Sequence, residues 1–79
     1  MTTRMWEARA AQGRTGDLVA WAAANLPDGA EATVYRSVED DRVVVIATWH
    51  AGEPRDLPEP PGDLVARPPH AWDFVAVAP

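Results

Sequence analysis

The sequence predicts a small α+β fold, an antiparallel sheet with one main helix, in a single domain spanning residues 1–79. Three observations lead to this prediction. Residues 42–50 are a run of mostly β-branched apolar residues, which is typical of a buried strand. Residues 17–26 are rich in alanine and carry an apolar stripe at helical spacing. Six of the eight prolines lie in residues 54–69, which excludes a long helix there.

Residues 42–50 are expected to form a central strand of the sheet. Both alternating sides of this stretch are largely apolar, a pattern that favours a strand covered on both faces. The stretch ends in a polar-aromatic pair, Trp49 and His50.

The first strand is expected over residues 4–10. One side of it is apolar and includes Trp6, while the other carries Glu7 and Arg9. The polar side faces either solvent or a cavity, and solvent is the favoured interpretation.

The helix is expected over residues 17–26, with Thr15 as its N-cap. Its apolar stripe includes Leu18 and Ala22. Pro27 is expected to end the helix, because a proline pushes the residue before it out of the helical region.

A second strand is expected over residues 30–38, where Arg36 shares a side with apolar residues. The acidic residues 39–41 then form a tight hairpin turn into the central strand. The last strand is expected over residues 70–77. The order is therefore strand, helix, strand, strand, proline-rich crossover, strand.

Composition excludes several classes of protein. Cysteine is absent, which excludes disulfides and thiolate zinc sites. The net charge is −5 and the seven basic residues are scattered arginines, so nucleic acid is not an expected partner. A chain of 79 residues has a small core, and association with a second copy is the remaining way to stabilise it. The absence of lysine indicates the codon bias of a GC-rich, bacterial genome.

The N-terminal residues lack the apolar region of a secretory signal, and no apolar run approaches the length of a membrane span. We therefore expect a cytoplasmic protein with no membrane partner.

The element order through residues 5–10, 17–26, 30–38, 42–50 and 70–77 resembles the ferredoxin-like βαββαβ unit. More narrowly, it is similar to the dimeric α+β barrel proteins, the superfamily of the antibiotic-biosynthesis monooxygenases. This resemblance implies a homodimer formed through the sheets and a cavity that holds an aromatic substrate or, in some members, haem. The chain departs from that pattern where proline-rich sequence replaces the second helix.

The candidate ligand-binding residues are Trp49, His50, His70 and Trp72, with Arg36 as a charged addition. The two Trp–His pairs flank the proline-rich crossover, which predicts that they meet around a planar aromatic ligand. The alternative is that the four tryptophans of the chain fill a small core, and this ordinary interpretation is favoured. The histidines also suit a hydrogen bond at a strand end better than a metal site.

Two functions remain open. The first is a small non-catalytic dimeric module that binds a partner subunit or a small ligand. The second is a cofactor-independent monooxygenase or cyclase-like enzyme acting on an aromatic metabolite. No phosphate-binding loop is present, and Ser37, the only serine, has no nucleophile-elbow sequence around it. The module is favoured because no catalytic constellation can be named, and neither a cofactor nor a metal is expected.

Overall fold

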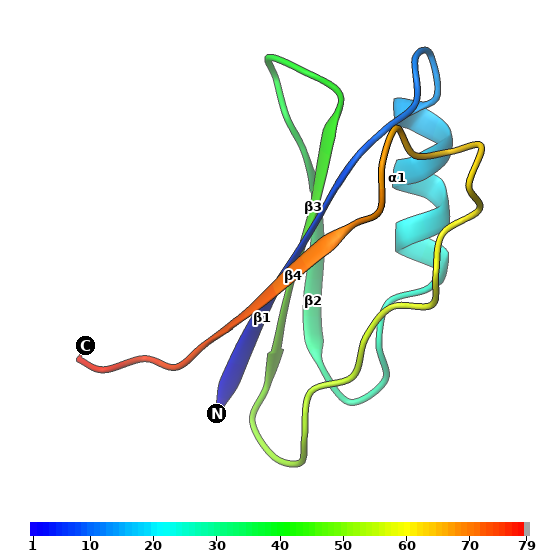
Figure 1. The fold of residues 1–79 in the computed structure, drawn as a ribbon. Helices are drawn as coiled ribbons and strands as arrows, with labels where there is room; N and C mark the ends of the chain where they lie inside the picture. The colour runs from blue at the N-terminus through cyan, green and yellow to red at the C-terminus, as the bar shows by residue number, and fades with distance from the viewer. Residues whose placement is uncertain (79) are drawn as a thin grey trace.

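A computed structural model describes residues 1–78, so Pro79 lies outside the described part of the predicted domain. The elements are β1 (Thr2–Arg9), α1 (Thr15–Ala24), β2 (Glu31–Arg36), β3 (Arg42–Trp49) and β4 (His70–Phe74). The strands form a four-stranded antiparallel sheet in the order β2-β3-β1-β4 (Figure 1). The predicted α+β class, with an antiparallel sheet and one helix, is confirmed.

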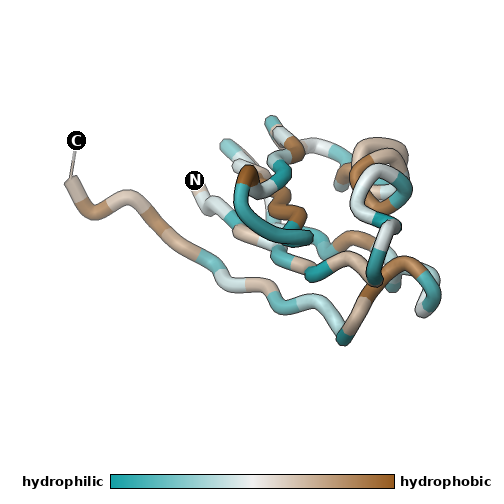
Figure 2. The backbone as a smooth tube through the Cα atoms, turned by 90° about the horizontal axis from the view of Figure 1, so that it is seen from above, coloured by the Kyte–Doolittle hydropathy of each residue, from teal (hydrophilic) through white to brown (hydrophobic). Residues whose placement is uncertain are grey.

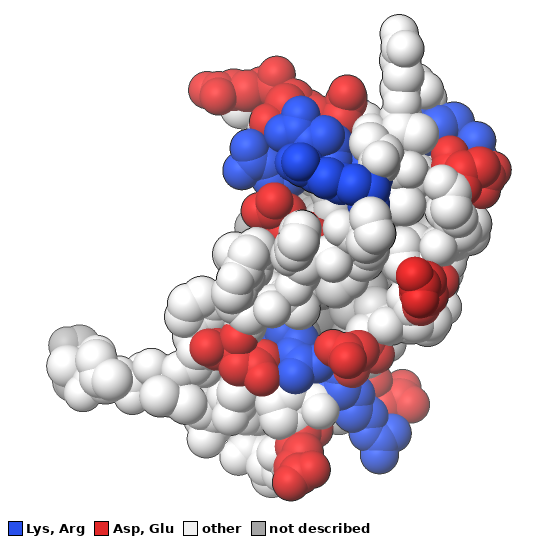
Figure 3. Space-filling view, in the orientation of Figure 1, with Lys and Arg blue, Asp and Glu red and all other residues white. Residues whose placement is uncertain are grey.

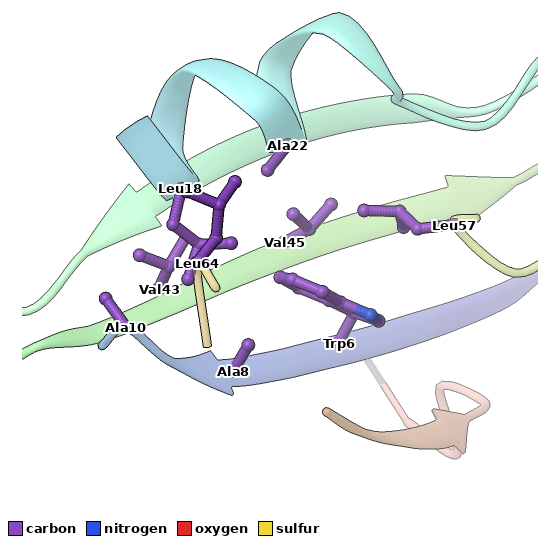
Figure 4. Packing of buried hydrophobic residues seen from close by; sticks show 9 residues of the cluster. All are labelled: Trp6, Ala8, Ala10, Leu18, Ala22, Val43, Val45, Leu57 and Leu64. Carbon is purple, nitrogen blue, oxygen red and sulfur yellow. The ribbon is translucent and has the colours of Figure 1, made fainter. Parts of the chain in front are cut away.

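The core lies on one side of the sheet, beneath a layer that α1 and the proline-rich segment (residues 54–69) build together (Figures 1 and 4). Alternate side chains of β1 and β3 point into this layer and meet apolar side chains from α1 and from the segment. The buried members are Trp6, Ala8, Ala10, Leu18, Ala22, Val43, Val45, Leu57 and Leu64. Three of the nine are alanines, so the core contains little apolar volume.

The helix begins earlier than the sequence predicted. Leu18 and Ala22 are fully buried on the expected stripe, but Thr15 is already helical, so its prediction as the N-cap is wrong. The Thr15 hydroxyl donates to Asp41 at 3.1 Å, in the loop between β2 and β3, and caps no helix N–H. This bond ties the start of α1 to the hairpin.

The sheet is covered on one face only, so the expectation that β3 is covered on both faces is wrong. Val43 and Val45 are fully buried, whereas Val44 and Ile46 on the alternate side are only half-buried. The physical reason is that α1 and the proline-rich segment lie on the same side of the sheet. Nothing in residues 1–78 forms a layer over the other side (Figure 1).

The hairpin between β2 and β3 forms as expected, but β2 is shorter than the predicted 30–38. The strand ends at Arg36 because Ser37 starts the turn, its hydroxyl accepting the backbone N–H groups of Glu39 and Asp40. Val38, which was expected on the apolar side of the strand, is 99% exposed.

The last strand ends at Phe74 and does not continue to residue 77. Phe74 pairs with Thr3, and β1 begins at Thr2, so the neighbouring strand ends at this point. The following residues extend away from the body of the molecule (Figures 1 and 2), with Val75 and Val77 exposed.

The proline-rich segment crosses from β3 to β4 without a helix, as its prolines predicted. Leu57 and Leu64 are its buried apolar anchors, and Val65 forms an isolated bridge to Ala10 just beyond β1. The backbone N–H of Ala66 also donates to the carbonyl of Arg9. Among the described residues, no helix has the length and apolarity that a membrane crossing requires.

Candidate functional site

The two predicted Trp–His pairs lie at different places in the sheet. Trp49 pairs with Thr2 at the start of β1, whereas His70 pairs with Glu7 five positions further along the same strand. Five positions correspond to roughly 17 Å along a strand. The structure therefore does not bring Trp49 and His50 together with His70 and Trp72 around one ligand.

Trp49 and His50 have different surroundings. The Trp49 side chain is buried, and its indole N–H donates to the carbonyl of Asp28 at 3.2 Å. This contact fastens the end of β3 to the turn before β2. His50 is exposed, and its Nε2 lies 3.3 Å from the carboxylate of Glu31.

His70 and Trp72 lie on the other edge strand, and their rings stack with centroids 5.9 Å apart and planes 22° from parallel. Trp72 is 45% exposed. Arg36 is exposed at the end of β2, where it pairs with Val43 and shares the helix side of the sheet. It has no ion-pair partner among residues 1–78. Arg36 therefore does not join either pair.

The side of the sheet away from α1 is here called the open face, and it carries a largely apolar middle row between two rows that also contain charged and polar residues. The strand register arranges it in three rows that cross all four strands. The middle row contains no charged residue, and the edge strands contribute aromatic residues, Tyr35 from β2 and Trp72 and Phe74 from β4. From one end to the other, the rows are Tyr35-Val44-Glu7-His70, Thr33-Ile46-Met5-Trp72 and Glu31-Thr48-Thr3-Phe74.

Charged side chains gather towards the two ends of the molecule, and the surface between them is mostly uncharged apart from an acidic group at the right side of the view (Figure 3). At one end of the open face, Arg9 and Arg42 share the carboxylate of Asp40, at 3.8 and 3.1 Å. Hydrogen bonds to Asp40, first from the backbone N–H of Arg42 and then from the Ser37 hydroxyl, lower the pKa of this carboxyl. At the other end, Glu31 lies beside His50.

A second feature lies on the opposite, helix-covered side of the sheet. A cleft of about 350 Å³ separates the proline-rich segment from β4, with Trp6 as its buried floor. Residues 56–59 form one wall and residues 68–71 form the other. The cleft lies beside β4, which α1 does not reach because it packs on β2 and β3.

Arg4 joins β1, β4 and the proline-rich segment at one end of this cleft. Its guanidinium donates two hydrogen bonds to Asp73 on β4, with Nε 2.6 Å from Oδ1 and Nη2 3.0 Å from Oδ2, and a third to Asp56. The bond from Arg4 and its positive charge hold the pKa of Asp73 below its usual value, and the same bond raises the pKa of Arg4. One arginine thus holds three segments together.

Sequence reasoning missed most of the open face. Of its residues only Trp72 and His70 were candidates, and its other apolar and aromatic members, Met5, Tyr35, Val44, Ile46 and Phe74, were not. Alternation along each strand separates the two sides, but only the register shows which residues of different strands share a row. The register follows from the three-dimensional pairing and is not visible in any single strand.

Among residues 1–78, no group of three or more histidine, aspartate or glutamate side chains is arranged to hold a metal ion. Comparison with protein-family models, with curated proteins and with solved structures found no match for this chain. The function is therefore argued from the open face and the cleft.

Proposed function

We propose that this chain is a non-catalytic module of ferredoxin-like topology that forms a homodimer through its open face. The observation that carries the proposal is the uncharged middle row of that face, which ends in a half-exposed tryptophan, Trp72. A contiguous exposed apolar surface with aromatic residues is typical of an interaction site.

The strand order supports the ferredoxin-like assignment. The order β2-β3-β1-β4 places the first and third strands in the middle, as a βαββαβ chain with antiparallel neighbours requires. The connection from β3 to β4 departs from that unit, because it is proline-rich and not helical. On the same basis, membership of the chain in the dimeric α+β barrel superfamily remains a proposal.

The size of the open face agrees with a modest dimer interface. Four strands about 4.8 Å apart, each contributing about six residues, give a surface of roughly 19 by 20 Å. Because side chains project from the sheet, the accessible surface area exceeds this flat area, and two copies would bury on the order of 1,000 Å² in total. This value is near the lower limit for specific interfaces. An association in the micromolar range is the expected strength.

The charges at the ends of the open face favour a second copy as the occupant. Arg9 and Arg42 share Asp40 at one end, where Glu7 also lies, whereas Glu31 lies beside His50 at the other end. A two-fold axis perpendicular to the strands brings the arginine end of one copy over the Glu31 end of its partner. Such an arrangement is self-complementary, as a two-fold interface has to be.

Sedimentation equilibrium between micromolar and submillimolar concentration tests this proposal. We expect the mass to rise from the monomer value of 8.6 kDa towards twice that value. A lysine in place of Trp72 puts a charge in the apolar row, so Trp72→Lys is expected to remain monomeric. A wild-type mass that stays at 8.6 kDa over the whole range would rule out the homodimer.

Val38→Lys is the matched control, because Val38 is 99% exposed in the hairpin and does not belong to any row of the open face. This variant introduces the same charge and is expected to dimerise like the wild type. Far-UV circular dichroism of both variants separates loss of association from loss of folding. Equal loss of dimer in the two variants would show that the open face is not the interface.

No observation favours the monooxygenase-like alternative. An enclosed pocket lined by Trp49, His50, His70 and Trp72 would favour that function. Trp49 instead points into the protein, and the two histidines flank opposite ends of the crossover without approaching each other.

A further inference from the structure

We propose that the cleft between the proline-rich segment and β4 binds a small primary amine that also carries a hydroxyl or carbonyl oxygen. The cleft opens on the helix side of the sheet, where Trp6 and Ala71 pair across β1 and β4. His70 borders both the cleft and the open face, but Trp6, Asp56 and Glu59, on which this proposal rests, do not belong to the open face, so the proposal does not depend on dimerisation.

The floor of the cleft presents an unused hydrogen-bond donor. Trp6 is only 4% exposed, yet its indole N–H donates to no atom of residues 1–78. Among the described residues, Arg9 Nε is the only side-chain nitrogen or oxygen that is both shielded from solvent and without a hydrogen-bond partner. The Trp6 nitrogen also has no partner, and it is therefore still reached by solvent. Figure 4 shows this nitrogen at the end of the ring that lies towards Leu57, which also lines the cleft.

The Trp6 ring also contacts Trp21 of α1. The ring centroids lie 6.2 Å apart with planes tilted by 35°, so the helix helps to hold the indole in place. An oxygen acceptor at the N–H of Trp6 can replace the solvent water as its hydrogen-bond partner, whereas a ligand without such an oxygen would displace that water and leave the donor unpaired. This requirement selects a ligand with a hydroxyl or carbonyl oxygen.

The wall beside Trp6 supplies negative charge. It carries two carboxylates, Asp56 and Glu59. Asp56 is bound by Arg4, which also binds Asp73, so one positive charge serves two carboxylates. Glu59 has no cation within 4.0 Å among residues 1–78. A cationic group is therefore the complement of this wall.

The dimensions and the remaining lining limit the ligand further. A volume of about 350 Å³ lies at the lower end of the range for small-molecule sites. Pro58, Pro68 and Pro69 give the walls an apolar, rigid character that suits the methylene groups of an amino alcohol. The chain contains no lysine, so none of its own side-chain ammonium groups competes for the carboxylates.

A titration with 4-aminobutan-1-ol, followed by ¹⁵N–¹H spectra of the indole groups, tests the proposal. A Trp6→Phe variant shows which of the four indole signals belongs to Trp6, because that signal disappears. We expect the Trp6 signal to shift with the amino alcohol and to shift far less with butane-1,4-diol or 4-hydroxybutyrate. These two probes have a similar length but lack the ammonium group. A Trp6 signal that does not move, or that moves equally with all three probes, overturns the proposal.

Glu59→Gln removes the unpaired carboxylate without changing its size, and we expect it to weaken amine binding about two- to fivefold. Glu39→Gln is the control, because it removes the same charge from the exposed hairpin turn. Equal weakening by the two variants would indicate general attraction to an acidic protein, and the site would then be rejected. The wild-type affinity is also expected to fall as sodium chloride is added, since the carboxylate is exposed.

Discussion

Arg4 on β1 clamps Asp73 on β4 through two parallel hydrogen bonds, of 2.6 and 3.0 Å. The Arg4 side chain is 17% exposed and that of Asp73 is 46% exposed, so the fork lies at the surface and differs from an ordinary surface ion pair by its two-pronged geometry. Because β4 has no buried residue of its own and the fork supplies the only side-chain hydrogen bonds between β4 and the other strands among residues 1–78, we expect the fork to help hold this edge strand to the sheet.

Arg4→Lys is therefore expected to loosen β4 while leaving the rest of the sheet intact. Lysine keeps the charge but cannot form the planar, two-pronged contact. Hydrogen exchange of the amides in residues 70–74 is expected to accelerate, with little change in β3. Arg14→Lys is the control, since Arg14 pairs with Asp17 and Asp63 away from β4. Unchanged exchange in β4 would show that backbone pairing alone holds the strand.

The same ion pair predicts a loss of stability in acid. The bond from Arg4 places the pKa of Asp73 in the folded state below its usual value of 3.8. A carboxyl with a lowered folded-state pKa stabilises the protein above its unfolded pKa, and the stabilisation is lost as the pH falls through the folded value. The urea midpoint is therefore expected to be flat near neutral pH and to fall below about pH 4.

Asp73→Asn is expected to reduce that acid dependence, because asparagine does not titrate. Asp40, whose pKa is also lowered, leaves a residual slope. Glu53→Gln changes an exposed carboxyl in the turn after β3 and is expected to retain the wild-type profile. Identical profiles for the two variants would show that the Arg4–Asp73 pair does not contribute to acid sensitivity.

The fold class could be predicted because its signals are local. The β-branched run in β3, the alanine-rich stripe that includes Leu18 and the concentration of prolines each restrict the backbone without knowledge of distant residues. Coverage of β3 could not be predicted in the same way. Val44 and Ile46 are apolar like Val43 and Val45, so the composition does not indicate that only one side has a layer over it.

The candidate site was harder to predict from the sequence, because it depends on distances across the sheet. His50 and His70 flank the crossover in the sequence, which predicted that they meet. The strand register keeps them apart. Similarly, the cleft is formed where the proline-rich segment passes β4 above Trp6. The path of an irregular segment depends on packing, which periodicity does not describe.

The thin core predicts a large effect of one substitution. Leu18 is fully buried between α1 and the sheet, and Leu18→Ala is expected to cost about 2–4 kcal/mol of unfolding free energy. Leu18→Met, which conserves volume, is expected to cost less than about 1.5 kcal/mol. Urea denaturation followed by circular dichroism measures both. A cost for Leu18→Ala no larger than that of the exposed change Val38→Ala would contradict the described packing.

Two glycines are expected to respond to alanine in opposite directions. Gly29, in the turn before β2, has a φ of +76°, and alanine there is expected to cost about 1–2 kcal/mol because its Cβ disfavours left-handed backbone. Steric crowding is not the cause, since the nearest atom to an added Cβ is Trp49 Cδ1 at 3.9 Å. Gly16 is the second residue of α1, with open space around an added Cβ, so Gly16→Ala is expected to stabilise the protein, by less than the roughly 0.5–1 kcal/mol typical of the middle of a helix. Thermal denaturation of the two variants and the wild type measures both effects, and a shift of the same sign in both would contradict these backbone assignments.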